Sequence, residues 1–289
     1  MRILFFCLLS VFSLSMIAQD DMLSMLGEED DTKIVRASFK TNRVINLHSL
    51  ENTAAGHLDF KISHRFGFIS TGIDEFFGLD NSTIRIGLEY GMTDKLMIGV
   101  GRSSYEKTVD GFIKYKILQQ KTGTHAFPFT LAYLGTGAIK TIPFANENRD
   151  NHFSSRVAYA HQLIIGRKMS PGFSFQLSPT LIHRNLVPNT NIKNDVYAIG
   201  AGTRIKLTNR TTFNVEYIYV LPDQIAEDYI NSLSVGLDIE TGGHVFQLHA
   251  TNSTSMIEKG FVAETTGKWK KGDIHFGFNI SRIFNVARK

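Results

Sequence analysis

The stretch that decides the fold is Asp273-Ile-His-Phe-Gly-Phe-Asn-Ile-Ser-Arg-Ile-Phe284. Successive side chains of an extended strand point to opposite faces. One face of this stretch is apolar and the other is small or polar, as expected for a barrel strand that meets lipid outside and a lumen inside. The apolar face holds Ile274, Phe276, Phe278 and Ile280; the other face holds Asp273, His275, Gly277, Asn279 and Ser281.

The same alternation recurs from Gly56 onward and marks eleven further strands by their outward apolar residues. No linker or block of like charge divides the chain between them. We therefore predict an all-β fold, a single antiparallel up-and-down transmembrane β-barrel of about twelve strands.

The connections between these strands alternate in length: most of those at one end are short, and five of the six at the other end are long. Short turns at one end and long loops at the other are the asymmetry of a bacterial outer-membrane barrel, whose even strand number returns both chain ends to the periplasm. A soluble β-sandwich has no reason to alternate in this way. The predicted inner turns are residues 91–94, 119–126, 168–172, 208–210 and 241–243, and the outer loops are 70–80, 104–108, 140–152, 184–193, 222–229 and 252–272.

The N-terminus divides into two predicted segments before the barrel, which spans residues 56–289. Residues 1–18 carry one charge, an apolar run and a final small residue, the pattern of a cleaved signal peptide. Residues 19–55 form a periplasmic N-terminal segment that begins as an acidic tail. Its part from 43 to 51 shows no clear period, which leaves two placements, an extra strand beside the barrel or a plug in its lumen. Cys7, the only cysteine, lies inside the signal, so no disulfide is expected.

The charge pattern excludes several classes of protein. The net charge is +4, but basic and acidic residues are interleaved and form no basic stripe, so no nucleic-acid partner is predicted. A mean hydropathy of −0.07 and the lack of a long apolar run argue against membrane-spanning helices. Membrane-spanning strands are compatible with the low mean hydropathy and with the lack of a long apolar run, since each strand needs only about nine to eleven residues.

Charged and polar side chains alternate with the outward apolar ones and therefore face inward. Charges inside a sealed interior are costly, so they require either a wet lumen or mutual pairing. The residues predicted to line the lumen are Asp59, Lys61, Arg65, Arg85, Glu89, Lys114, Lys116, Arg156, Arg204, Lys206, Glu216, Asp238, His275 and Asn279.

Several stretches resemble a family of uncharacterised β-barrel proteins from Bacteroidota. They include Gly56-His-Leu-Asp-Phe-Lys-Ile-Ser-His-Arg-Phe-Gly67 and Thr265-Thr-Gly-Lys-Trp-Lys-Lys-Gly-Asp-Ile-His-Phe-Gly-Phe-Asn-Ile-Ser-Arg282. The resemblance covers essentially the whole chain after the signal. It implies a barrel in the outer membrane of a Gram-negative bacterium, and the family carries no established activity to transfer.

No motif in the sequence indicates catalysis, a metal or a cofactor, so we predict a protein that is not an enzyme. His64 and His161 fall on outward faces, but no serine shares those faces within reach, which argues against a lipid hydrolase. The histidines are dispersed and lack metal-ligand spacing. Trp269 and its neighbouring lysines precede the closing strand; we predict an interfacial anchor, with a constriction of the barrel mouth as the alternative.

Two functions fit this reading. The first is a passive pore or transporter for small solutes with a polar lumen of mixed charge. The second is a closed-lumen scaffold that binds a partner through its loops or N-terminal segment. The expected contacts are outer-membrane lipid, lipopolysaccharide and the barrel-assembly machinery, with a small solute in the first case.

Overall fold

The computed structural model describes residues 31–144, 150–187 and 192–287. The predicted signal peptide and most of the acidic tail lie outside these described residues.

Twelve antiparallel strands form one closed barrel, as the alternation predicts. Each strand pairs with its neighbours in chain order, and the barrel strands are 8 to 14 residues long. Their bounds are β2 (His57–Phe68), β3 (Ser82–Gly91), β4 (Leu96–Ser103), β5 (Thr108–Leu118), β7 (Thr130–Lys140), β8 (Val157–Ser170), β9 (Phe173–Arg184), β10 (Asp195–Lys206), β11 (Thr211–Val220), β12 (Ser232–Thr241), β13 (His244–Thr251) and β14 (His275–Asn285).

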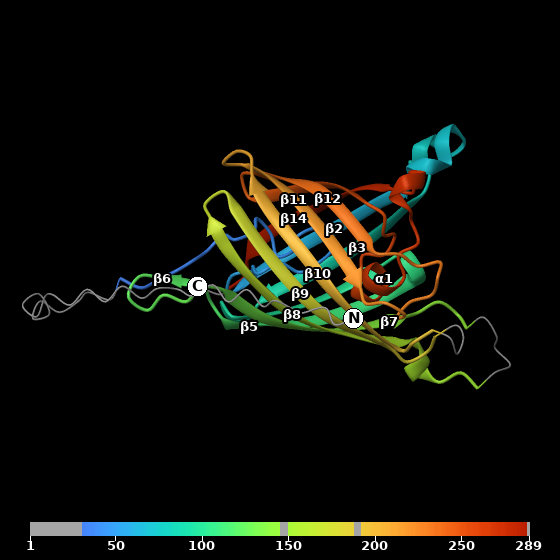
Figure 1. Cartoon of the computed structure of the whole chain (residues 1–289), viewed down its shortest axis with the longest axis horizontal. Coiled ribbons are helices and arrows are strands. Elements are labelled where there is room, and N and C mark those ends of the chain that lie inside the picture. The colour runs from blue at the N-terminus through green and yellow to red at the C-terminus, as the bar shows by residue number, and fades with distance from the viewer. Residues whose placement is uncertain (1–30, 145–149, 188–191, 288–289) are drawn as a thin grey trace, which may run out of the picture.

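The closing strand is β14, which pairs with β2 and removes the last open edge (Figure 1). Its register runs from His275 opposite Phe68 to Asn285 opposite His57, with one irregularity between His275 and Gly277. An unpaired edge in lipid would leave a row of backbone groups without partners, so closure is a condition of spanning the membrane.

The outer wall is apolar, and several of its large side chains are half exposed, such as Val100 at 59% and Phe276 at 56%. Such a surface would be unstable in water and is suited to lipid. Among the described residues, no helix is long and apolar enough to cross a bilayer.

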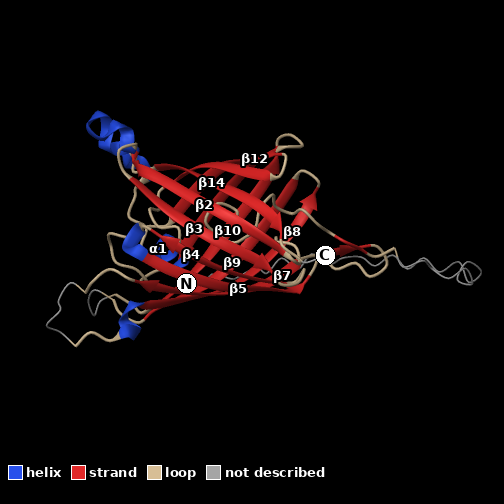
Figure 2. Cartoon of the chain, turned by 180° about the vertical axis from the view of Figure 1, so that it is seen from behind, coloured by secondary structure: helices blue, strands red, loops and turns tan. Residues whose placement is uncertain are grey.

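The short helical segments gather at the end with the long loops (Figure 2). Most connections at this end are long and most at the other end are short; the exceptions are residues 104–107 and 119–129. Bacterial outer-membrane barrels carry their long loops on the outer side, so we call this end the outer one. The helical segments are η1 (Ile69–Gly78), η2 (Tyr105–Lys107), η3 (Phe153–Arg156), α1 (Glu258–Ala263) and η4 (Trp269–Lys271).

The described part of the N-terminal segment begins in a small sheet that is separate from the barrel and then continues into the lumen. β1 (Lys33–Ile34) pairs with β6 (Lys121–Thr122) in a separate small sheet at the end opposite α1 (Figure 1). Residues 38–53, which we call the strap, then enter the lumen, where residues 42–50 are all buried. The chain leaves at the inner end, where Ala55 bridges Gly91 before β2 begins. Both ends of the strap therefore lie at the inner mouth.

Inward-facing glycines of β10 make room for the strap. A Cβ on Gly200 would lie 2.6 Å from Leu47 Cδ1, and one on Gly202 would lie 3.0 Å from Val44 Cγ2. Such distances are below ordinary contact, so a larger residue at either position would displace the strap or the wall. The glycines thus allow the strap to pack directly against the backbone of the barrel.

Candidate functional site

The strap folds into a tight hairpin inside the lumen. Arg43 and His48 form an antiparallel bridge, and the amide of Val44 donates to the carbonyl of Leu47 at 2.8 Å. The amide of Ser49 donates to the carbonyl of Asn42 at 2.9 Å. These bonds satisfy part of the hairpin's backbone, and the remaining buried amides need partners on the barrel wall.

Glu216 on β11 supplies the partner for the hairpin tip. Its Oε2 accepts hydrogen bonds from the amides of Ile45, Asn46 and Leu47, at 3.1, 3.0 and 2.9 Å. Successive backbone amides that converge on one oxygen form a concave anion site. Glu216 therefore holds the tip by a charged acceptor, and we call this contact the latch.

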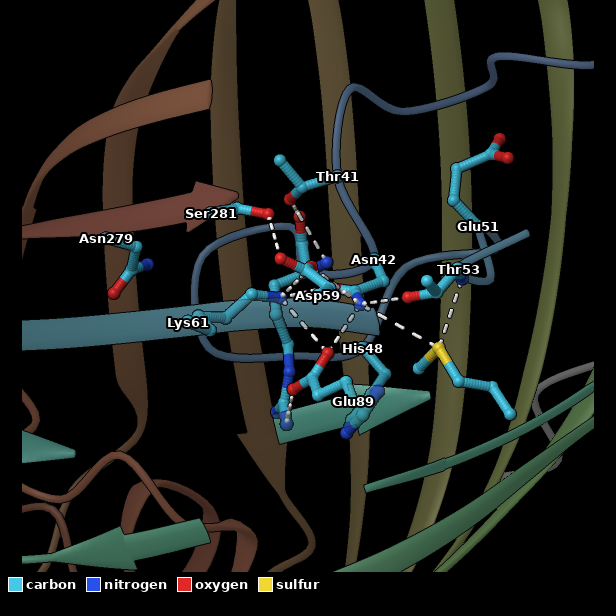
Figure 3. Close-up of polar contacts among 12 residues, drawn as sticks. Thr41, Asn42, His48, Glu51, Thr53, Asp59, Lys61, Glu89, Asn279 and Ser281 are labelled. Carbon is cyan, nitrogen blue, oxygen red and sulfur yellow. Dashed lines mark hydrogen bonds and ion pairs between the residues drawn. The ribbon is translucent and has the colours of Figure 1, made fainter. Parts of the chain in front are cut away.

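A second contact joins the strap to the charges of β2 and β3 (Figure 3). Asn42 Nδ2 donates to Glu89 Oε2 at 2.5 Å, and the same carboxylate lies 3.2 Å from Lys61 Nζ. Arg43 approaches the other oxygen of Glu89 at 3.5 Å. Lys61 also lies 3.5 Å from Asp59 and donates to the side chain of Asn42. The strap thus completes a buried group of opposite charges.

Further wall side chains donate to strap carbonyls. Lys114 Nζ reaches Ser49 at 3.2 Å, Gln176 Nε2 reaches His48 at 2.8 Å, and Gln247 Nε2 reaches Val44 at 2.5 Å. Weaker contacts join Arg204 to Ser38 and Asn279 to Ile45, each at 3.4 Å. These hydrogen bonds give several charged and polar wall side chains a partner on the strap, which helps to hold charges of both signs inside the barrel.

The residues predicted to line the lumen separate into three groups. Asp59, Lys61, Arg65, Glu89, Lys114, Arg204, Glu216, Asp238 and Asn279 surround the strap directly or through one shared partner. Arg85 instead pairs with Asp110 on β5, and His275 bonds to Thr254 and to the carbonyl of Phe66. Lys116 is half-buried, Lys206 is exposed near the inner turn between β10 and β11, and Arg156 lies at the outer mouth.

An outer cap closes the other side of the strap. It consists of residues 252–268, which fold inward from the last long loop and include α1. Arg43 lies 3.3 Å from Glu258, and Arg65 donates to the carbonyl of Ser253 at 2.6 Å. Phe261 is buried in the same apolar cluster as Leu47. Burial raises the pKa of Glu258, and nearby Arg43 opposes that shift.

Little space is left between the strap, the cap and the wall. The space lined by Arg43, Asn46, Arg85, Met256 and their neighbours has a volume of about 10 Å³. That is close to the minimum for one water molecule. At this level of the barrel, the strap and the cap fill the lumen.

Sequence reasoning did not identify the residues of the strap and the cap that contact the polar wall. It identified the polar wall, but Asn42, Arg43 and Glu258 lie in segments without strand periodicity. The observation that residues 43–51 mix apolar and polar residues without a period was the one available signal.

Trp269 is partly buried, and its indole Nε1 donates to the carbonyl of Leu233 at 3.1 Å at the outer rim; its anchoring role stays a prediction. Among the described residues, no three His, Cys, Asp or Glu side chains gather as a metal site requires.

The closed twelve-stranded wall, its apolar outer face and its polar interior define an outer-membrane β-barrel. The chain belongs to the family described as membrane bound beta barrel domain (DUF5777), whose model matches residues 39–284. The matched region therefore covers strap residues 39–53 of this chain as well as the barrel.

Solved structures similar to this chain include a porin and an outer-membrane protein. The NanC porin has a TM-score of 0.48 at 8% identity, with 78% of this chain and 98% of that chain covered. Omp33 of Acinetobacter baumannii has a TM-score of 0.41 at 10% identity, covering 79% and 98%. LpxR from Salmonella typhimurium has a TM-score of 0.35 at 10% identity, with 79% of this chain and 99% of that chain covered. These likenesses are too distant to carry a function. No match was found among curated protein sequences.

Proposed function

We propose that this protein is a gated passage for small solutes across the outer membrane, with the strap as its gate. The observation that carries the proposal is the path of the strap. Both of its ends emerge at the inner mouth, beside Gln120 and Gly91, so it can withdraw toward the periplasm without breaking a barrel strand.

The chemistry of the wall supports the same proposal. The strap is held by side-chain contacts to Glu216, Glu89 and Lys114, and all three groups would line a hydrated passage once the strap has left. A wall that served only as a filled core would be at least as stable with apolar side chains, since buried ion pairs seldom add net stability. The mixed charge along the wall therefore favours a lumen that is sometimes wet.

A closed-lumen scaffold is the second candidate. The observation that favours it is the double closure, because the strap fills the lumen from one end and the cap with Glu258 covers it from the other. In a scaffold, the strap and cap would stay in place for as long as the barrel is folded.

Single-channel recording at rising urea concentration separates the two candidates. A strap without strand pairing to the wall is a smaller cooperative unit than the barrel and should open first. We expect reversible conductance steps at urea concentrations at which a heat-dependent gel shift shows an intact barrel. A bilayer that stays silent until the barrel itself unfolds would refute gating and leave the scaffold.

A further inference from the structure

A second, larger cavity lies at the outer mouth beside α1. Its volume is about 390 Å³, within the range of about 300–1,000 Å³ usual for small-molecule sites. Residues from η2, β7, β8, β9 and the cap line it, so distant parts of the chain converge there. We call it the outer cavity; it is separate from the small space beside the strap.

A chain of ion pairs runs through the lining of the outer cavity. Lys140 lies 2.6 Å from Glu106, and Lys259 lies 3.2 Å from the other oxygen of Glu106. Lys259 also lies 3.0 Å from Glu264, which Arg184 approaches at 3.3 Å. Each carboxylate is therefore shared by two cations. The cations are incompletely balanced, and an added anion would be attracted.

Arg156 adds a fourth cation to this lining. Its guanidinium stacks over Phe144 at 3.7 Å from the ring centre and donates to the carbonyl of Lys140 at 3.1 Å. Four cations against two carboxylates, Glu106 and Glu264, give the lining a net charge of 4 − 2 = +2. An arginine held rigidly by its neighbours binds a carboxylate with less loss of side-chain freedom.

The charges of this lining are maintained at neutral pH. Burial alone would lower the pKa of Lys259, but Glu264 and Glu106 outweigh it and raise the pKa. Burial alone would raise the pKa of Glu106, but Lys259 and Lys140 outweigh it and lower the pKa. Both shifts favour the ionised forms of Lys259 and Glu106, which maintains their ion pair near neutral pH.

The rest of the lining is apolar or carries hydroxyl groups. Val157, Ile257 and Leu186 provide aliphatic surface, and Tyr105 and Tyr229 provide hydroxyls. We propose that the outer cavity binds small organic carboxylates, with the carboxylate at the cationic chain and the body of the solute against this surface. A neutral solute of the same shape lacks the electrostatic attraction to these cations and should bind more weakly.

The position of α1 links the outer cavity to the strap. This link rests on the proposed function of the strap as a gate. The proposal that the outer cavity binds carboxylates does not depend on that function. Lys259 and Glu264 line the outer cavity, while the adjacent Glu258 contacts Arg43 and His48 of the strap. A solute that competes for Lys259 therefore acts on the element that holds the strap from outside.

Titration calorimetry of the full-length refolded protein in detergent tests the site. D-glucuronate and succinate serve as probes, and D-glucose serves as the neutral counterpart of glucuronate. We expect at least one of the two carboxylates to bind. If glucuronate binds, glucose should bind at least about tenfold more weakly, because it lacks the carboxylate. Failure of both carboxylates to bind a correctly folded protein, or equal binding of glucose and glucuronate, would overturn the proposal.

Charge variants distinguish binding from a structural role. Lys140→Gln and Lys259→Gln should each weaken carboxylate binding about tenfold. Lys107→Gln removes an exposed charge from the same rim, outside the cavity lining, and should leave binding unchanged. Glu106→Gln should tighten binding, because it frees the two cations it shares; if it weakens binding as Lys259→Gln does, the ion-pair chain is structural and the proposal fails. Binding without any conductance would leave this site standing while the gated passage fails.

Discussion

Deletion of residues 38–52 is expected to convert a silent barrel into a conducting one. The strap contributes no strand to the wall, so the ladder from β2 to β14 stays complete without it. Its removal exposes Lys61, Glu89, Lys114 and Glu216 to a water-filled lumen, in which their charges are hydrated. A twelve-stranded barrel is wide enough for a narrow channel once its interior is cleared.

Planar-bilayer recording checks this first prediction. We expect the conductance of the deletion variant to be at least about tenfold higher than that of the full chain, because a barrel with an empty lumen conducts and a filled one does not. The matched control deletes residues 20–34, which precede the strap, and should remain closed. Because the cap stays over the outer mouth, a further variant replaces residues 253–266 by a Gly/Ser linker and should conduct more. If both strap-deleted variants fold, as judged by a heat-dependent gel shift, and neither conducts, the strap is not what closes the lumen.

Glu216→Ala is expected to release the hairpin tip while the strap is still present. The substitution leaves the amides of Ile45, Asn46 and Leu47 buried without an acceptor. Each unsatisfied buried donor costs about 1–3 kcal/mol, so the closed state should lose about 3 kcal/mol or more. At about 1.4 kcal/mol per factor of ten, the ratio of open to closed protein rises roughly a hundredfold.

The open fraction in single-channel records measures this effect. Glu216→Gln keeps an oxygen acceptor but loses the charge, so it should fall between Ala and the native residue. Glu240→Gln is the matched control, since Glu240 forms an exposed ion pair with Lys40 and such pairs contribute little. Equal behaviour of Glu216→Ala and Glu240→Gln would show that the latch does not hold the gate.

The sequence predicts the barrel wall almost completely, because lipid and lumen impose a strict two-residue alternation. Val100 and Phe276 outside, with Glu89 and Glu216 inside, follow from that rule alone. The number of strands and the uneven ends follow from the turns between them. The strand ends are placed less well: Arg156, predicted to line the lumen, lies in η3 at the outer mouth.

The interior of the site could not be predicted in the same way. The strap and the cap are irregular segments, and their placement depends on partners far along the chain, such as Glu216 for Leu47 and Glu258 for Arg43. Those contacts join residues 169 and 215 positions apart. Local periodicity carries no information about them, so the sequence left both the plug and the extra strand open.

A cysteine pair between the strap and β10 tests the central claim most directly. A Cβ on Gly202 would lie 3.0 and 3.3 Å from the two methyl carbons of Val44, which suits a disulfide between these positions. Cys7, the only native cysteine, is replaced by serine in every variant. Val44→Cys with Gly202→Cys should cross-link under mild oxidation in the outer membrane, whereas Val44→Cys with Ala201→Cys, which faces outward, should not. Absence of the Val44–Gly202 cross-link, with both thiols labelled by a soluble maleimide, would contradict a strap inside the folded barrel.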